Sequence, residues 1–409
     1  MILQQFHPFG HPDGTPVIRI REYCAVGRRV LATGVAIEVV LVGILLAWKR
    51  LDGLDLDVYR LGAQAFFDRG DPYGPLPPTR NGTLLPFTYP PFAAFVFAPL
   101  LVIPPDVALV GITVVSVVAL GAVLALCFSR YDRRLHVFGG AALIVQAVAS
   151  FSEPVRATLG FGQINLLLVL LVAVDALAPV RRRGFLVGLA AAVKLTPAAF
   201  VLFFLLRKDF RAAGRAVATF AACALLAWAI APQASVTYWT KLVFQGERVG
   251  DPGYIGNQSL HGLLARLGAP TWAWLVAVAV TLVVTALVMR RADAVVALLA
   301  CAVGALLVSP VSWTHHWVWA APVIGVLTWR GRRFRPLVLG TAALATMVFV
   351  VSPLWDHRSV WPLAESYVLT GVLLLLVLGL VAKPLDDPFD AAGQRRDVAR
   401  LDRGEHADA

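Results

Sequence analysis

An acidic motif, Asp55-Leu56-Asp57-Val58-Tyr59, directly follows the first hydrophobic run of the chain. Ionisable side chains beside membrane segments are costly and by default are candidates for a functional site. If the segment is helical, about 200° separates the two carboxylates, so only one can face a site, whereas Asp55 and Tyr59 share a face. On spacing alone, a solvated acidic stretch after a membrane helix also explains the motif.

A second motif holds two adjacent histidines, His315 and His316, between Trp313 and Trp317. An aromatic belt at the membrane interface with incidental imidazoles is the simpler interpretation. A metal site would need further histidines or carboxylates at compatible spacing, so none is predicted. A protonated imidazole that donates charge-assisted hydrogen bonds to a phosphate is the more natural role.

A lysine stands in the middle of a hydrophobic segment, in the motif Lys194-Leu195-Thr196-Pro197. An ammonium in such a segment needs a partner. A phosphate, Asp55 or Glu153 could supply one. Four amide side chains lie near the other motifs: Gln163, Asn165, Asn257 and Gln258. Amides can bind sugar hydroxyls, and they can cap helices equally well.

The elements that must position these residues are membrane helices. Of the 409 residues, 58% are hydrophobic and 15% charged, and the mean hydropathy is +0.73. Uninterrupted apolar runs such as Asp106–Phe128, Trp272–Met289 and Tyr367–Ala382 are long enough to cross a bilayer. Lipid permits only helices or closed barrels, and these runs do not alternate. The composition excludes a soluble domain and predicts an all-α, polytopic membrane helix bundle of about twelve hydrophobic helices, some of them short or re-entrant.

The formal net charge of +11 follows membrane topology and does not indicate a nucleic-acid partner. Basic residues cluster in short loops, which we assign to the cytoplasm together with both termini. Segment 184–206 lies between two such loops, so we expect a helical hairpin with Lys194 at its outer tip, a single Pro-kinked span being the alternative. The Pro-rich stretch Pro86–Pro105 predicts a short or partly inserted helix. The basic clusters are Arg130, Arg133 and Arg134; Arg181, Arg182 and Arg183; Arg207, Lys208, Arg211 and Arg215; Arg290 and Arg291; and Arg330, Arg332, Arg333 and Arg335.

This topology leaves the polar motifs on the outer side, with two long loops, Lys49–Tyr89 and Gln233–Ala269, expected as structured covers. Three parts are predicted: a cytoplasmic segment 1–29, a transmembrane catalytic domain 30–383, and a disordered cytoplasmic tail 384–409. Neither a phosphate-binding loop nor a dinucleotide motif is found, so a nucleotide donor is not supported. A membrane-borne phosphate donor would need no such motif. No cofactor is predicted, and assistance by a divalent ion is left open.

An ordered set of motifs resembles glycosyltransferase family 87, multispanning enzymes of the GT-C type. The resemblance covers about residues 30–383. The motifs, in order, are Asp55-Leu56-x-Val58-Tyr59, Gly62-Ala63, Tyr73, Phe87-Thr88-Tyr89-Pro90-Pro91, Gly162-Gln163-Ile164-Asn165, Lys194-Leu195-Thr196-Pro197, Asn257-Gln258-Ser259 and Ser312-Trp313-x-His315-His316.

The resemblance implies transfer of mannose from polyprenol-phosphate-mannose to a glycolipid, a phosphatidylinositol mannoside, in α-1,2 linkage. It implies inversion, with the site on the periplasmic face of the inner (plasma) membrane. The family's essential aspartate matches Asp55, with Asp57 as the fallback. His315 or His316 would hold the donor phosphate with Lys194. The remaining predicted sugar or acceptor contacts are Asp57, Tyr59, Tyr89, Glu153, Gln163, Asn165, Asn257, Gln258 and Trp313.

Two alternatives remain at this stage. One is a relative within the family that transfers arabinofuranose or acts on lipomannan. The other is a transporter or flippase for a lipid-linked sugar, which would use a similar cavity but form no glycosidic bond.

Overall fold

The computed structural model describes residues 36, 40, 43, 51–331 and 336–382. The predicted cytoplasmic segment 1–29, nearly all of the first predicted span and the tail 384–409 lie outside these residues. The division of the chain into three parts therefore stays a prediction.

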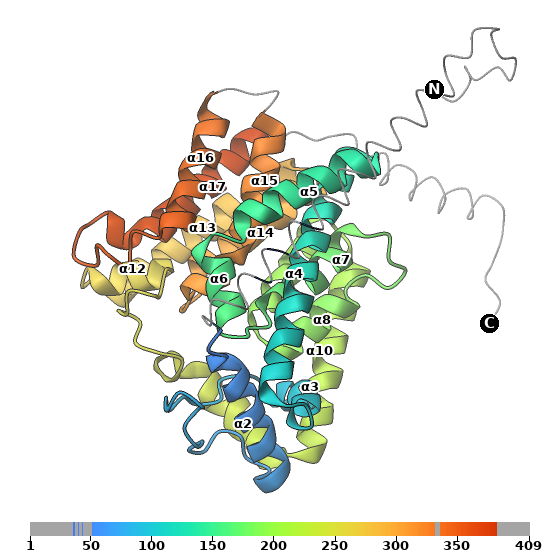
Figure 1. Cartoon of the computed structure of the whole chain (residues 1–409), viewed down its shortest axis with the longest axis vertical. Helices are drawn as coiled ribbons and strands as arrows, with labels where there is room; N and C mark the ends of the chain where they lie inside the picture. Colours follow the sequence, from blue (N-terminus) through green and yellow to red (C-terminus); the bar gives the residue numbers. More distant parts are fainter. Residues whose placement is uncertain (1–35, 37–39, 41–42, 44–50, 332–335, 383–409) are drawn as a thin grey trace, which may run out of the picture.

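The described residues are helical, as predicted, and contain no strand beyond an isolated bridge between Asn257 and Trp313 (Figure 1). The first half holds α2 (Leu54–Arg69), α3 (Ala93–Phe97), η1 (Ala98–Leu101), α4 (Pro105–Ser129), α5 (Leu135–Ala149), α6 (Glu153–Gly160), α7 (Asn165–Leu177), α8 (Phe185–Val193), η2 (Thr196–Phe200) and α9 (Val201–Leu206). The second half holds α10 (Phe210–Ile230), α11 (Pro232–Thr240), η3 (Leu242–Phe244), η4 (Gly246–Arg248), α12 (Leu260–Arg266), α13 (Thr271–Arg291), α14 (Ala294–Val308), η5 (Thr314–Trp319), α15 (Ala320–Gly331), α16 (Pro336–Val351), η6 (Leu363–Glu365) and α17 (Ser366–Val381).

The described residues include helices that are long and apolar enough to cross a membrane. By length and composition, 4 helices of the described residues can cross a bilayer, or up to 5 if the bent pair Val137–Ala149 and Glu153–Gly160 forms one span. α4, α13 and α17 confirm the three helices predicted from the longest apolar runs. The predicted total of about twelve hydrophobic helices in the membrane is not confirmed, because several apolar helices of the described residues, such as α7 and α14, have only 10–17 residues.

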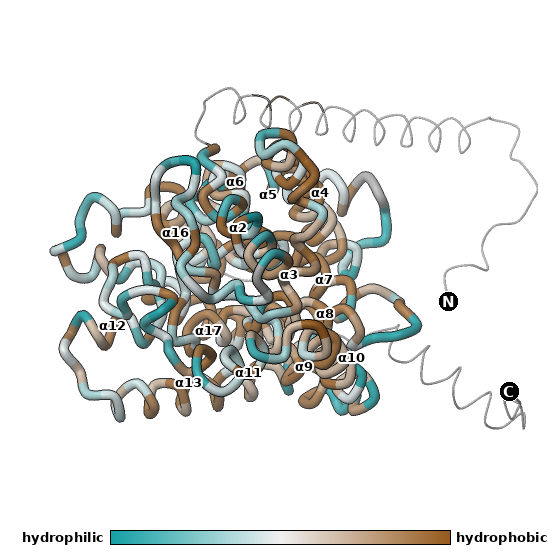
Figure 2. The backbone as a smooth tube through the Cα atoms, turned by 90° about the horizontal axis from the view of Figure 1, so that it is seen from below, coloured by the Kyte–Doolittle hydropathy of each residue, from teal (hydrophilic) through white to brown (hydrophobic). Residues whose placement is uncertain are grey.

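The surface of α13 fits a lipid environment. Most of its bulky apolar side chains are exposed, including Leu275, Val276, Val280 and Val283. Exposed apolar surface on this scale is unfavourable in water and costs nothing in lipid. Figure 2 shows the hydrophobic stretches concentrated on helices and many of the hydrophilic ones in the connections.

The chain reverses direction at Lys194, as the hairpin interpretation predicted. α8 ends at Val193, and η2 and α9 lead back from Thr196 to Leu206. Arg183 before α8 pairs with Asp209 after α9, with the guanidinium and carboxylate 3.7 Å apart, so both ends of the hairpin lie together. The alternative of a single kinked span is thereby ruled out.

Most of the basic connections gather at one end of the bundle. Side chains join these connections in pairs: Tyr131 with Asp293, Arg330 with Asp293, Arg207 with the Ala292 carbonyl, and Arg183 with Asp209. α4 and α14 each have one terminus at this end, so their other termini, at Pro105 and Val308, lie at the opposite end. The bundle thus has a basic end and a second end, where the polar motifs lie.

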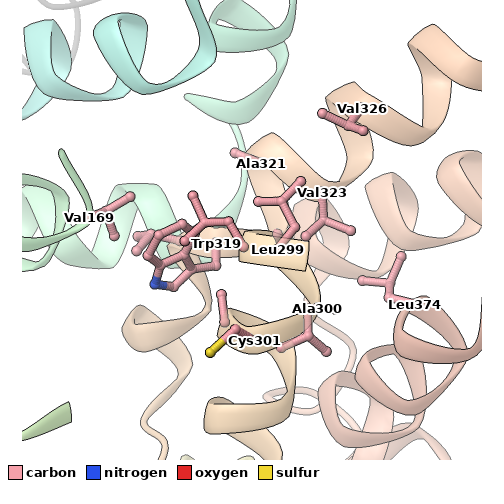
Figure 3. Close-up of a cluster of buried hydrophobic side chains, with 14 of the residues drawn as sticks. Val169, Leu299, Ala300, Cys301, Trp319, Ala321, Val323, Val326 and Leu374 are labelled. Atoms are coloured by element: carbon pink, nitrogen blue, oxygen red, sulfur yellow. The ribbon is translucent and has the colours of Figure 1, made fainter. Parts of the chain in front are cut away.

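A large apolar core holds the middle of the bundle. Side chains of α14 and α15 meet around Trp319, with Leu299, Cys301 and Val323 beside it (Figure 3). A second apolar cluster packs α2 and α3 against the loop that carries Phe87 and Tyr89. These two clusters fix the elements on either side of the polar motifs.

Candidate active site

The polar motifs meet at one cavity of about 590 Å³. Its walls come from α2, the loops before α3 and after α11, the loop before α7, the tip of the α8–α9 hairpin, and the segment Ser309–His316. Eight residues predicted from the sequence line it: Asp55, Tyr89, Glu153, Gln163, Lys194, Trp313, His315 and His316. The structure therefore brings together residues up to 261 positions apart in the chain (316 minus 55).

Asp55 is placed by the docking of the α2 N-terminus onto the loop after α6. The backbone N–H groups of Asp55 and Leu56 donate to the carbonyl of Phe161, at 3.0 and 3.1 Å, and that of Gly53 donates to Gly160 at 2.9 Å. These bonds satisfy donors that a helix N-terminus leaves unpaired. An aspartate in the first turn also complements the helix dipole. The position of the Asp55 carboxylate is thus set by backbone contacts as well as by its side chain.

Gln163 fixes the orientation of this carboxylate. Its amide nitrogen donates to Asp55 Oδ2 at 2.8 Å, and its amide oxygen accepts from the Tyr59 hydroxyl at 2.7 Å. A carboxylate only accepts, so these partners define which way the amide faces. The Tyr59 hydroxyl lies 3.1 Å from that of Tyr89. Asp55 and Tyr59 therefore share a face of α2, as predicted, and both contact Gln163.

The environment of Asp55 suits a base. Burial raises the pKa of its carboxyl to about 6, while the hydrogen bond from Gln163 and the charge of Lys194 oppose this rise. The carboxyl is therefore mostly ionised at neutral pH. Because its pKa is higher than that of an ordinary aspartate, it accepts a proton more readily.

Lys194 also lines the cavity and contacts a second set of polar side chains. Its ammonium donates to Asn165 Oδ1 at 2.9 Å and lies 3.2 Å from His316 Nε2. It is also 5.7 Å from the centre of the Tyr89 ring. Asn165 in turn donates to the carbonyl of His315 at 3.0 Å. Asn165 thus connects the lysine to the histidine segment from behind the cavity wall.

The surroundings of the two histidines favour neutral side chains over the imidazolium expected from the sequence. Burial, followed by the charge of Lys194, lowers the pKa of His315 to about 3 and that of His316 well below its usual range. Since an ammonium has no acceptor, His316 Nε2 accepts from Lys194, which puts its proton on Nδ1. The cation of this group is therefore Lys194.

Asp57 does not reach the cavity. It points to the opposite side of α2, where Arg80 donates to its carboxylate at 2.9 Å and pairs also with Asp106. The carboxylate is buried in this ion pair, so it faces neither the cavity nor open water. Its predicted sugar contact receives no support from this position.

Asn257 and Gln258 are buried in contacts that hold loops together. The Asn257 side chain accepts from the backbone N–H of Ser312 at 2.9 Å, and that of Gln258 donates to the carbonyls of Ile255 and Ala364. Neither lines the cavity. They position the segment that carries Trp313 and the histidines.

Glu153 lines the cavity with its carboxylate already bound to protein. It accepts from Thr314 Oγ1 at 2.8 Å and from the Tyr367 hydroxyl at 2.9 Å. These contacts connect α6 to η5 and α17. Lys194 makes no ion pair with Glu153 among the described residues, although the sequence allowed one.

Several cavity residues were missed from the sequence. Arg248 and the aromatic residues Tyr238, Tyr254 and Trp355 line the same walls. They lie in irregular loop segments or short helices, where no periodicity indicates their direction. The aromatic content of the loop 233–269 was the available signal.

No group of three or more His, Cys, Asp or Glu side chains that could hold a metal ion occurs within residues 51–331 and 336–382. Asp55 and the histidines contact Gln163, Lys194 and Asn165 instead. This donor set favours acid–base and anion-binding chemistry.

The buried Asp55 carboxylate can act as a general base, and Lys194, whose charge acts on it, can stabilise a developing anion. The chain belongs to glycosyltransferase family 87, whose sequence profile matches residues 87–310. The protein is therefore a glycosyltransferase, as the resemblance implied.

Curated relatives match over most of their length. The chain is 36% identical to the polyprenol-phosphate-mannose-dependent alpha-(1-2)-phosphatidylinositol mannoside mannosyltransferase of Mycolicibacterium smegmatis, over 89% of this chain and 93% of that protein. It is 38% identical to the protein of the same name from Mycobacterium tuberculosis, over 87% and 92%. A mannosyltransferase named for phosphatidylinositol pentamannoside, also from M. tuberculosis, is 34% identical over 87% and 88%.

Proposed function

We propose that this protein transfers mannose from polyprenol-phosphate-mannose to a phosphatidylinositol mannoside, forming an α-1,2 linkage with inversion. The observation that carries the proposal is the Asp55 carboxylate, which is buried and oriented by Gln163 and whose pKa is lowered by the charge of Lys194. The names of the relatives support this donor and this class of acceptor.

In the proposed reaction, a hydroxyl of the acceptor attacks the anomeric carbon of the donor mannose. The bond from that carbon to the acceptor oxygen forms while the bond to the phosphate oxygen breaks. The hydroxyl proton passes to the Asp55 carboxylate, and polyprenyl phosphate departs with the bonding electrons. Inversion needs only this one base, because a phosphate leaves as an anion without being protonated.

The departing phosphate gains negative charge, which Lys194 would stabilise as a fixed cation. Neutral His316, with its proton on Nδ1, would hold the ammonium through Nε2. The tyrosines Tyr59 and Tyr89 would act through Gln163, since the Tyr59 hydroxyl contacts its amide oxygen. The role of Gln163 is then to orient the base, whereas sequence reasoning predicted a sugar contact.

We place the cavity on the periplasmic face of the inner membrane. The basic connections meet at the opposite end of the bundle, and such clusters mark the cytoplasmic side. A polyprenol-linked donor and a glycolipid acceptor would both reach the cavity from the bilayer. The bilayer is therefore a partner in this proposal.

The test is transfer by the purified protein in lipid vesicles. Labelled polyprenol-phosphate-mannose and a phosphatidylinositol mannoside are supplied, and the product is analysed for a new α-1,2-linked mannose. A product with the arabinose-linked donor instead would move the assignment to another sugar. Translocation of the donor without any new glycosidic bond would indicate the flippase.

A further inference from the structure

Arg248 is a second cation in the cavity, and the proposed reaction gives it no role. It ends η4 in the loop between α11 and α12 and lines the cavity wall. Its Nη2 donates to the carbonyls of Tyr73 at 2.9 Å and Phe87 at 3.2 Å. Its Nε is buried and has no hydrogen-bond partner among the described residues.

The charge of Arg248 has no direct counterion in the described part of the chain. The nearby Asp71 carboxylate accepts from the backbone N–H of Tyr73 at 2.8 Å, and no ion pair joins it to Arg248. A guanidinium stays protonated in proteins. A half-buried cation with a free donor is unfavourable unless an anion binds to it.

A chain of packed aromatic rings connects the two cavity cations. Lys194 is 5.7 Å from the ring centre of Tyr89, which lies 5.6 Å from that of Phe87. The Phe87 ring centre lies 6.1 Å from that of Tyr73, and Arg248 is 5.8 Å from the centre of the Tyr73 ring. The contact path from Lys194 to Arg248 therefore passes through three rings.

We propose that Arg248 binds the phosphodiester of the glycolipid acceptor. The inference rests on the proposed function. The donor phosphate is bonded to the carbon that reacts, so it must lie beside Asp55, where Lys194 is. The acceptor phosphodiester is separated from the reacting hydroxyl by sugar and inositol rings. It therefore needs a cation at a distance from Asp55, with flat apolar surfaces in between.

The chemistry of the two cations fits this division. Arginine presents a planar set of N–H donors that matches two phosphate oxygens, and its Nε is the donor left free here. Tyr254, whose ring is exposed and lines the same cavity, offers a face for a sugar ring of the acceptor. Both lipids of the reaction are anionic, and the cavity holds one cation for each.

The test compares two acceptors, a phosphatidylinositol mannoside and an alkyl mannoside that lacks phosphate. In Arg248→Gln we expect the KM for the phosphatidylinositol mannoside to rise about 10- to 100-fold, the effect of losing charge-assisted hydrogen bonds. The KM for the donor and the activity on the neutral mannoside stay unchanged. Arg248→Lys keeps the charge and recovers part of the affinity. Lys241→Gln, an exposed cation of the same loop, is the matched control and changes none of these values.

Two kinetic results would overturn the assignment. A raised KM for the donor would mean that Arg248 binds the donor phosphate. An equal loss with both acceptors would mean that Arg248 only ties its loop to the Tyr73 and Phe87 carbonyls. Equilibrium binding of the two acceptors to wild type and Arg248→Gln needs no catalysis. If Arg248→Gln still prefers the acceptor with the phosphodiester, the assignment of Arg248 is wrong, even when transfer is observed. If no transfer is observed but this preference depends on Arg248, the proposed function fails and the assignment of Arg248 stands.

Discussion

Removing the Gln163 amide is expected to shift the pH dependence of transfer. Gln163 donates to Asp55 Oδ2 at 2.8 Å and opposes the effect of burial, which raises the pKa of this carboxyl to about 6. A hydrogen bond to a charged group contributes about 1.5–3 kcal/mol, and 1.36 kcal/mol corresponds to one pKa unit. In Gln163→Leu, the pKa of Asp55 should therefore rise to about 7 or 8.

The sign follows from the role of the carboxylate as a base, which acts only when ionised. Activity is present above the pKa and is lost as the pH falls through it. At pH 6.5, about three quarters of the wild-type carboxyl is ionised, against about a tenth if its pKa is 7.5. We expect kcat/KM of the variant to be about eightfold below that of the wild type at pH 6.5 and to match it above about pH 8.5. Burial lowers the pKa of Lys194 to about 8, so the activity of both proteins falls as this ammonium loses its proton.

The assay is kcat/KM for mannosyl transfer by vesicle-reconstituted protein, measured from pH 5 to 9. Gln64→Leu is the control, since Gln64 is an exposed glutamine of α2, the helix that carries Asp55. Its acid limb should match that of the wild type. If the apparent pKa of the acid limb stays near 6 in Gln163→Leu and activity is reduced equally at every pH, the electrostatic role of this amide is refuted.

Three further predictions concern the hairpin and the second carboxylate. Asp57→Asn should retain most of the transfer activity, since Asp57 lies outside the cavity; loss of activity in well-folded protein would refute the choice between the carboxylates. Lys194→Met should lower kcat/KM by about 100- to 1,000-fold through loss of the phosphate-stabilising cation, measured in the same assay, and a smaller loss would argue for another cation. Gly184→Ala should destabilise the fold by about 1–3 kcal/mol or more, because a Cβ would come 2.0 Å from the Ala212 carbonyl oxygen at a φ of +96°. Thermal unfolding in detergent checks this against Gly214→Ala, which has open space around it.

The membrane helices and the site could be predicted from different signals. Long continuous apolar runs can be read directly from the sequence, and they located α4, α13 and α17 correctly. The hairpin followed from the conflict between a lysine-proline motif and two basic loops. The number of full spans is not confirmed, because a short apolar run does not show whether its helix is long enough to cross.

The side-chain assignments depended on contacts that a linear pattern does not contain. The spacing of Asp55 and Tyr59 predicted a shared helix face, but the partner of both, Gln163, is more than 100 residues away, a separation of 108 from Asp55. Asn257 and Gln258 were assigned to sugar because amides suit hydroxyls and backbone carbonyls equally. The protonation of the histidines depended on burial, which the sequence does not give.

Transfer by Asp55→Asn tests the central claim most directly. The substitution keeps the size of the side chain and its place at the start of α2 but removes the base. We predict that Asp55→Asn accumulates in membranes like the wild type and loses mannosyl transfer by about 100- to 10,000-fold. Near-normal transfer by Asp55→Asn would contradict the assignment of the base, and with it the mechanism built on this cavity.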